Sequence, residues 1–182
     1  GGARGPALLI NDWPRDRFLD AAAVDPGNLL GALTVDGAAS CVAADLDGNG
    51  ACDIVLVPSK GPARIILNMT AGNHWLALDL LGVESRDQKA RSNASGIGAR
   101  VEIKTGAVYQ EFAVGVPAGP AAMAPRRVHA GLGRHAKVDW LRITWPDAVL
   151  QAELEVAADR TLAIVELPRK ISSCPHLFAW DG

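Results

Sequence analysis

The oxygen-bearing side chains with the most specific spacing in this chain lie between Asp45 and Asp53. Asp45, Asp47, Asn49 and Asp53 fall on odd-numbered positions, and the backbone carbonyl of Ala51 fills the remaining one. Ca²⁺ takes about six to eight oxygen ligands at about 2.3–2.6 Å, whereas Mg²⁺ keeps more water and fewer protein ligands. The pattern therefore predicts a Ca²⁺ site whose ligands are Asp45, Asp47, Asn49, Ala51 and Asp53.

The flanks of this loop indicate strands. A helix–loop–helix calcium loop carries a bidentate Glu at its twelfth position, where this chain has Leu56. Residues 54–57 are an apolar, largely β-branched run before Pro58, and residues 42–44 are a short apolar run. A polar hairpin turn is the alternative, because Asp, Asn and Gly are also turn residues. We favour the metal site, since three carboxylates so close together repel one another without a cation.

Composition bounds the class of protein. The 182 residues are 49% hydrophobic and carry a net charge of −2, so a sizeable core is expected and a basic nucleic-acid-binding surface is not. No stretch approaches the ~20 apolar residues of a membrane-spanning helix. Three cysteines leave one unpaired. Cys41 and Cys52 could form a disulfide across a hairpin, but we favour two small buried thiols, and Cys174 lies far from both.

Short apolar or alternating runs between turn residues predict an all-β fold, most plainly an antiparallel sandwich. The best helix candidate is the Ala-rich stretch 18–24, which Pro26 and Gly27 stop. In residues 137–145, one face of the expected strand takes Val138, Trp140 and the alternate positions after them. Strands are expected at residues 8–10, 29–35, 41–44, 54–57, 63–67, 74–81, 99–104, 109–116, 137–145, 150–156 and 161–167.

Two segments of the middle region resemble one family. They are Asn73-His74-Trp75-Leu76, followed by Gly96-Ile97-Gly98-Ala99-Arg100-Val101, and His129-Ala130-Gly131-Leu132-Gly133, followed by Val138 to Pro146. Together they resemble the ASPIC/UnbV domain, a module of secreted proteins that commonly accompanies FG-GAP/VCBS-type repeats of integrin-α-like β-propellers. The Asp45–Asp53 loop resembles the calcium loop of such a repeat. Ala130 stands where this family usually carries an aromatic residue. Asp147-Ala148 replaces the turn glycine that usually follows Trp-Pro in the family.

The resemblance implies a domain plan. Residues 1–70 are expected to be a propeller-blade fragment with the calcium loop, and residues 71–170 an ASPIC/UnbV β-sandwich. Residues 171–182 would begin a further strand pair or a linker. Because a blade needs neighbours, we expect a fragment of a longer protein, or self-association of the blade part.

Other chemistry is weakly supported. Ser95 lacks the first glycine of a nucleophile elbow, and the Gly-x-Gly pairs at 96–98 and 131–133 lack a third glycine for dinucleotide binding. We therefore predict no catalytic residues. The exposed-loop residues Arg86, Lys89 and Arg91 could bind an acidic polysaccharide. Some of the five tryptophans could stack on sugars: Trp13, Trp75, Trp140, Trp145 and Trp180.

The expected function is a non-enzymatic, calcium-stabilised adhesion or ligand-binding module. Its setting would be secreted, periplasmic or at the cell surface, and its ligand a protein or a glycan. The first alternative is a carbohydrate-binding module that uses exposed Trp. The second is a non-catalytic part of a larger enzyme.

Overall fold

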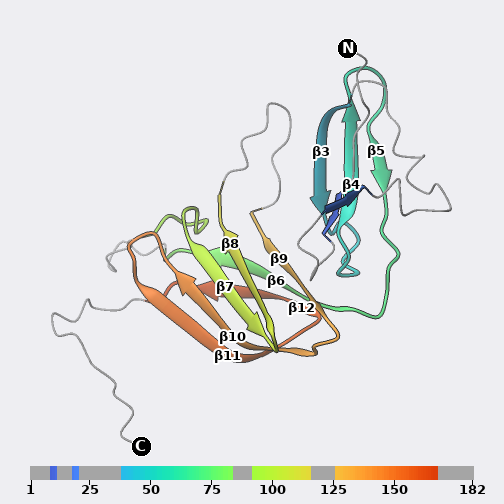
Figure 1. The fold of residues 1–182 in the computed structure, drawn as a ribbon. Helices are drawn as coiled ribbons and strands as arrows, with labels where there is room; N and C mark the ends of the chain where they lie inside the picture. The colour runs from blue at the N-terminus through green and yellow to red at the C-terminus, as the bar shows by residue number, and fades with distance from the viewer. Residues whose placement is uncertain (1–8, 12–17, 21–37, 84–91, 116–125, 168–182) are drawn as a thin grey trace, which may run out of the picture. The chain divides into compact units, whose positions relative to one another are not determined.

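The computed structural model describes residues 9–11, 18–20, 38–83, 92–115 and 126–167. In these ranges the regular structure is strand throughout, and no helix occurs (Figure 1). The described residues form two compact units, one up to Gly72 and one from Asn73 onward. The expected all-β class is confirmed for this part of the chain.

The first unit contains two small antiparallel sheets. Strand β1 (Leu9–Asn11) pairs with β2 (Phe18–Asp20), so the helix expected from residue 18 is wrong at its start. Strands β3 (Ala38–Ala44), β4 (Asp53–Pro58) and β5 (Arg64–Ile66) form a three-stranded sheet in chain order. Leu56 of β4 is buried and packs against Ile54 and Ile66.

The second unit contains two larger sheets. One has the order β11-β10-β7-β8 and is antiparallel throughout. The other has the order β12-β6-β9, in which β6 pairs antiparallel with β9 but parallel with β12. The strands are β6 (His74–Leu81), β7 (Arg100–Thr105), β8 (Val108–Ala113), β9 (Val128–Gly133), β10 (Lys137–Thr144), β11 (Leu150–Ala157) and β12 (Arg160–Val165).

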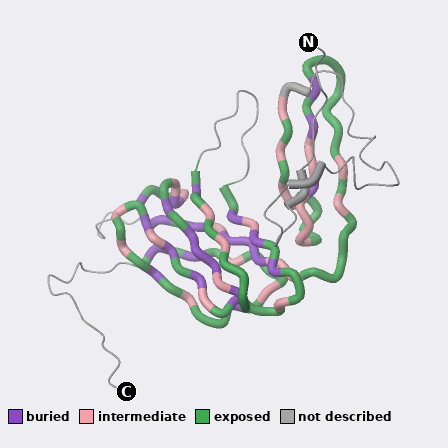
Figure 2. The backbone as a smooth tube through the Cα atoms, viewed as in Figure 1, coloured by how far each residue is buried: buried purple, intermediate pink, exposed green. Residues whose placement is uncertain are grey.

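The two sheets of this unit share one hydrophobic core. Leu76 and Leu78 of β6 belong to the same buried cluster as Val101 of β7 and Leu141 of β10, and Trp145 is almost fully buried. Buried positions alternate with exposed or half-buried ones along β9, whereas β6 and β7 each contain three consecutive buried residues (Figure 2). A core supplied by facing sides of two sheets is the arrangement of a β-sandwich.

The alternation expected along β10 changes phase. Leu141 and Ile143 are buried as a period of two requires, but Val138, which has the opposite parity, is also buried. The register stays constant, but Asp139 and Glu155 do not pair between Val138↔Val156 and Trp140↔Leu154. Glu155 has φ +50° at this irregularity, and Val138 and Val156 on its far side both lie in the core.

Strand β9 was not expected. Its sequence is Val-His-Ala-Gly-Leu-Gly, and glycine and alanine are depleted in strands. Val128, Ala130 and Leu132 nevertheless alternate with exposed or half-buried residues and enter the core. The strand expected at 29–35 and the segment 171–182 lie outside the described residues.

Candidate metal-binding site

The acidic loop connects two antiparallel strands. Ala44 ends β3, Asp53 begins β4, and the two residues pair with each other. The expected strand setting is therefore confirmed, and a helical calcium loop is excluded. Gly48 and Gly50 have φ of +81° and +86°, a conformation that glycine adopts cheaply. The loop therefore turns tightly enough to bring its side chains together.

Three of the expected ligands converge. Asp45, Asp47 and Asp53 each offer a carboxylate oxygen, and these oxygens lie within 4.8 Å of one another. The three side chains differ in exposure: Asp47 is exposed, Asp45 is half-buried, and Asp53 has no exposed surface. Carboxylates spaced in this way can share one hard cation.

Asp53 is anchored by the backbone on both sides. Its Oδ2 accepts a hydrogen bond from the Leu46 amide (2.8 Å), and its Oδ1 accepts one from the Asn68 amide (2.7 Å). These bonds stabilise a buried negative charge, which would be very costly without partners. Asp53 therefore has a structural role as well as a place in the acidic cluster.

The outer part of the loop is organised by its own amides. Asp45 accepts hydrogen bonds from Gly48 and Gly50, and Asp47 accepts from the backbone and side-chain amides of Asn49. The Asn49 Oδ1 accepts from the Ala51 amide at 2.7 Å. In this arrangement the side chain of Asn49 braces the loop, and its oxygen faces Ala51.

Asn68 was missed as part of this site. Its Nδ2 donates to the Cys52 carbonyl, and its own carbonyl accepts from Asn49 Nδ2 at 3.0 Å. Its Oδ1 accepts from both the amide and the hydroxyl of Thr70. The polar Asn-Met-Thr sequence after β5 was the available signal, although nothing local indicates which loop it would contact.

The donor set fits a hard cation. Each carboxylate oxygen has two lone pairs, so an oxygen that accepts one N–H bond can still face an ion. The nearby soft donor, Cys52, has a raised pKa because of burial and the charges of Asp45 and Asp53, which favours the neutral thiol. Oxygen ligands of this kind suit Ca²⁺ better than Zn²⁺ or copper.

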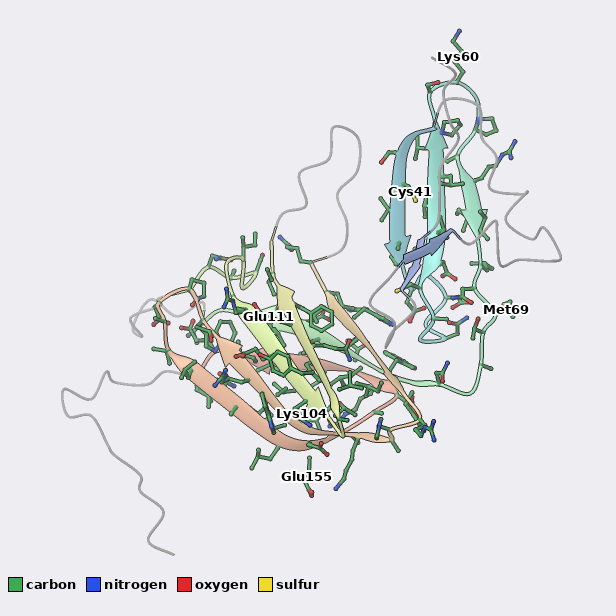
Figure 3. The ribbon with its side chains drawn as sticks, in the orientation of Figure 1. Cys41, Lys60, Met69, Lys104, Glu111 and Glu155 are labelled. Carbon is green, nitrogen blue, oxygen red and sulfur yellow. The ribbon has the colours of Figure 1, made fainter. Side chains whose placement is uncertain are left out.

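The disulfide interpretation is not supported. Cys41 and Cys52 are both free thiols, and Cys41 lies opposite Leu56 across the sheet. Cys41 is exposed on β3 (Figure 3), so the favoured alternative of two buried thiols is wrong for this residue. Cys174 lies outside the described residues.

A second polar group lies on the face of the four-stranded sheet away from the core. Arg142 forms a two-pronged ion pair with Glu102, and Tyr109 donates a hydrogen bond to the same carboxylate. The Arg142 guanidinium lies 5.9 Å from the centre of the Trp140 ring. The ring centres of Trp140 and Tyr109 are 6.2 Å apart. Lys104 and Glu111, labelled in Figure 3, come from the adjoining strands β7 and β8.

These contacts shift the pKa of Glu102 strongly. The hydrogen bonds from Arg142 and then Tyr109 lower the pKa of Glu102 to about 2. The same hydrogen bond to Glu102 raises the pKa of Tyr109. Glu102 is therefore a permanently charged anchor at neutral pH and not an acid–base group.

Trp75 and the histidines of the described residues lie in the second unit, whereas the acidic loop lies in the first. Trp75 is half-buried and stacks on His129 with ring centres 5.7 Å apart, and His74 pairs with Asp159 at 2.7 Å. His135 lines a pocket described below. Arg86, Lys89, Arg91, Trp13, Trp180 and His176 lie outside the described residues.

Comparison with known proteins found a family similarity in the second unit. No curated protein matches the chain. Within the part that the structure describes, no helix is long and apolar enough to cross a bilayer. Residues 89–170 match the family model described as "ASPIC and UnbV", so this part of the chain is similar to ASPIC/UnbV domains.

Proposed function

We propose that this chain is a non-enzymatic, calcium-stabilised adhesion or ligand-binding module of a larger extracellular protein. In this proposal the first unit belongs to an FG-GAP/VCBS-type propeller, and the ASPIC/UnbV domain accompanies it. The setting would be secreted, periplasmic or at the cell surface. The ligand would be a protein or a glycan.

The observation that carries the proposal is the convergence of Asp45, Asp47 and Asp53 in a strand-linked loop. The three carboxylates would hold the ion, and the carbonyl of Ala51 and the oxygen of Asn49 could complete its shell after a small side-chain rotation. The ion would offset the mutual repulsion of the carboxylates. The bound loop would then hold β3 and β4 in their observed register.

The blade assignment is supported by the small antiparallel sheet that carries the loop. Strands β3, β4 and β5 follow one another in space as in the chain, as the strands of a propeller blade do. The hydrophobic cluster in the described residues of this sheet has one buried member, Leu56, against which Ile54 and Ile66 pack. So small a core favours packing against further blades or a second copy.

Asp47→Ala is the sharpest test of the ion. Asp47 is exposed, and within the described residues its side chain accepts hydrogen bonds from Asn49 alone, so its loss should leave the calcium-free fold intact. Calcium at ~100 times its dissociation constant adds about 2.7 kcal/mol of stability to the parent protein. We expect calcium to raise the melting temperature of the parent and not of Asp47→Ala.

Glu111→Gln is the matched control, because it removes an exposed carboxylate from the other unit. It should keep the full response to calcium. An equal rise in the parent and Asp47→Ala proteins would refute the site. Repeating the scan with magnesium separates the two ions, since Mg²⁺ should stabilise the parent less at equal concentration.

A carbohydrate-binding function is the second candidate, supported by the neighbouring rings of Trp140 and Tyr109. Tyr109 is 50% exposed, and the charged pair Glu102–Arg142 lies beside both rings. Aromatic faces flanked by polar groups can stack on sugars and bind their hydroxyls. A glycan array probed with the parent and with Tyr109→Ala tests this, and equal signals from both would reject it.

A further inference from the structure

We propose that a pocket at the edge of the ASPIC/UnbV domain binds a carboxylate group of an organic ligand. The pocket has a volume of about 350 Å³ and lies where β8, the edge of one sheet, approaches β9, the edge of the other. Gln110 of β8 donates to the Gly131 carbonyl of β9 at 2.9 Å and joins the two edges. This volume is within the range of small-molecule pockets, roughly 300–1,000 Å³.

The main observation is an unpartnered hydroxyl. Thr105 lines the pocket, is only 1% exposed, and its Oγ1 has no hydrogen-bond partner. A buried hydroxyl without a partner is destabilising, and most such groups in native proteins are satisfied. A ligand atom in the pocket would supply the missing partner.

The other lining groups select an anion. Arg134 and His135 come from the turn between β9 and β10, and the lining contains no carboxylate. The turn is held by the hydrogen bond from the His135 amide to the Leu132 carbonyl at 3.2 Å. A guanidinium suits the two oxygens of a carboxylate, and the hydroxyl of Thr105 can donate to one of them.

The position of His135 depends on a glycine. Gly106, in the β7–β8 turn, has φ +54°, and a Cβ there would lie 2.7 Å from Cε1 of His135. The missing side chain lets the imidazole pack against the turn that follows Thr105. The apolar side chains of Val108 and Leu132 complete the wall, which favours an organic body over a bare inorganic anion.

Two kinds of ligand share this chemistry: an acidic sugar and an acidic peptide side chain. The test titrates the full chain with glucuronate and with N-acetylaspartate amide, and follows the backbone amide signals of Gly106 and Gly133 by NMR. Glucose is the neutral control for glucuronate. Saturable shifts with one acidic probe identify the source, and shifts with both show that the carboxylate is the shared determinant.

Substitutions of residues inside and outside the pocket test whether the acidic probes bind there. Thr105→Val and Arg134→Gln should each weaken binding about tenfold, the effect of one charge-assisted hydrogen bond. Thr105→Ser keeps the hydroxyl and should bind like the parent. Arg126→Gln removes an exposed charge outside the pocket and should have no effect.

The stability of Thr105→Val separates binding from folding. Because Oγ1 has no partner, the unliganded variant should melt no lower than the parent. The proposal is overturned if neither acidic probe binds, if glucose binds equally well, or if Arg126→Gln weakens binding as much as Arg134→Gln. It concerns a different unit from the calcium site, so failure of one leaves the other standing.

Discussion

The backbone amide of Asn68 donates a hydrogen bond to Oδ1 of Asp53, across 15 residues of sequence. Asp53 begins β4, and Asn68 follows β5, the neighbouring strand. The bond ties the end of one strand to the acidic loop at the start of another. The geometry of the loop is therefore set partly by the sheet and not by the loop alone.

This bond predicts that Asp53 and Asp47 behave differently without metal. Asp53→Asn replaces one acceptor oxygen with a donor that faces a backbone N–H, so unfolding should become easier by about 1–3 kcal/mol. Asp47→Asn should change stability by less than about 0.5 kcal/mol, as most exposed substitutions do. Urea unfolding in excess chelator measures both, and equal losses would contradict the assigned anchor role of Asp53.

Glu102 should contribute to acid stability. Its pKa is lowered to about 2 in the folded protein from an ordinary 4.5. Its contribution is therefore complete above the unfolded pKa and is lost as the pH falls from about 4.5 toward 2. We expect Glu102→Gln to be less stable than the parent at pH ~6 and to show a shallower loss of stability on acidification.

Glu111→Gln is the control for this experiment, because Glu111 lies directly opposite Glu102 on β8 but is more exposed. Its acid profile should follow that of the parent. Urea midpoints measured across the acidic range give the comparison. A parent-like slope in Glu102→Gln would show that the Arg142 and Tyr109 contacts do not hold the carboxylate charged.

Tyr109 offers a direct spectroscopic readout of the same contact. It is the one tyrosine in the chain, so phenolate absorbance reports on it without ambiguity. Its pKa is raised above 10 because the hydroxyl donates to Glu102. Alkaline titration should show this in the parent, and Glu102→Gln should return the pKa toward about 10. Identical titrations in both proteins would exclude the hydrogen bond.

Ala148→Gly should stabilise the second unit. Ala148 has φ +66° in the turn after Trp145, a conformation that costs a residue with a Cβ about 1–2 kcal/mol. Glycine removes this cost but adds flexibility to the unfolded chain, for a net gain of about 0.5–1 kcal/mol. Thermal unfolding of the full chain measures the change in the second unit.

Ala152→Gly is the control for this prediction, and the expected change in stability has the opposite sign. Ala152 is an exposed strand residue paired with Arg142, and its φ is not positive. Glycine there should cost about 0.5–1 kcal/mol. Destabilisation of both variants would show that the turn is not strained.

Most strands could be predicted from local pattern. The runs at β4, β6, β10 and β11 alternate or remain apolar over the observed strand lengths, and turn residues separate them. The turn at Ala148 was marked by an unusual residue where a glycine was expected. Side-chain alternation is a property of each strand by itself, which is why sequence reasoning could reach it.

Local pattern could not predict which strands pair with one another, or which side chains of a strand face the core. Strand β9 pairs with β6 although glycines lower its strand propensity, because its three apolar side chains fill the core between two sheets. The parallel pairing of β12 with β6 joins segments more than 80 residues apart. The burial of Val138 accompanies a positive φ at Glu155, on the neighbouring strand.

The acidic loop shows most clearly which contacts follow from residue spacing and which follow from tertiary packing. Residue spacing brings Asp45, Asp47 and Asp53 together, because a glycine-rich turn of that length has few ways to run and any of them gathers its side chains. The partnership of Asp53 with Asn68 and the unpartnered hydroxyl of Thr105 arise only once distant strands pack. Contacts of that kind depend on which surfaces meet in the folded chain, and no local pattern of residues specifies them.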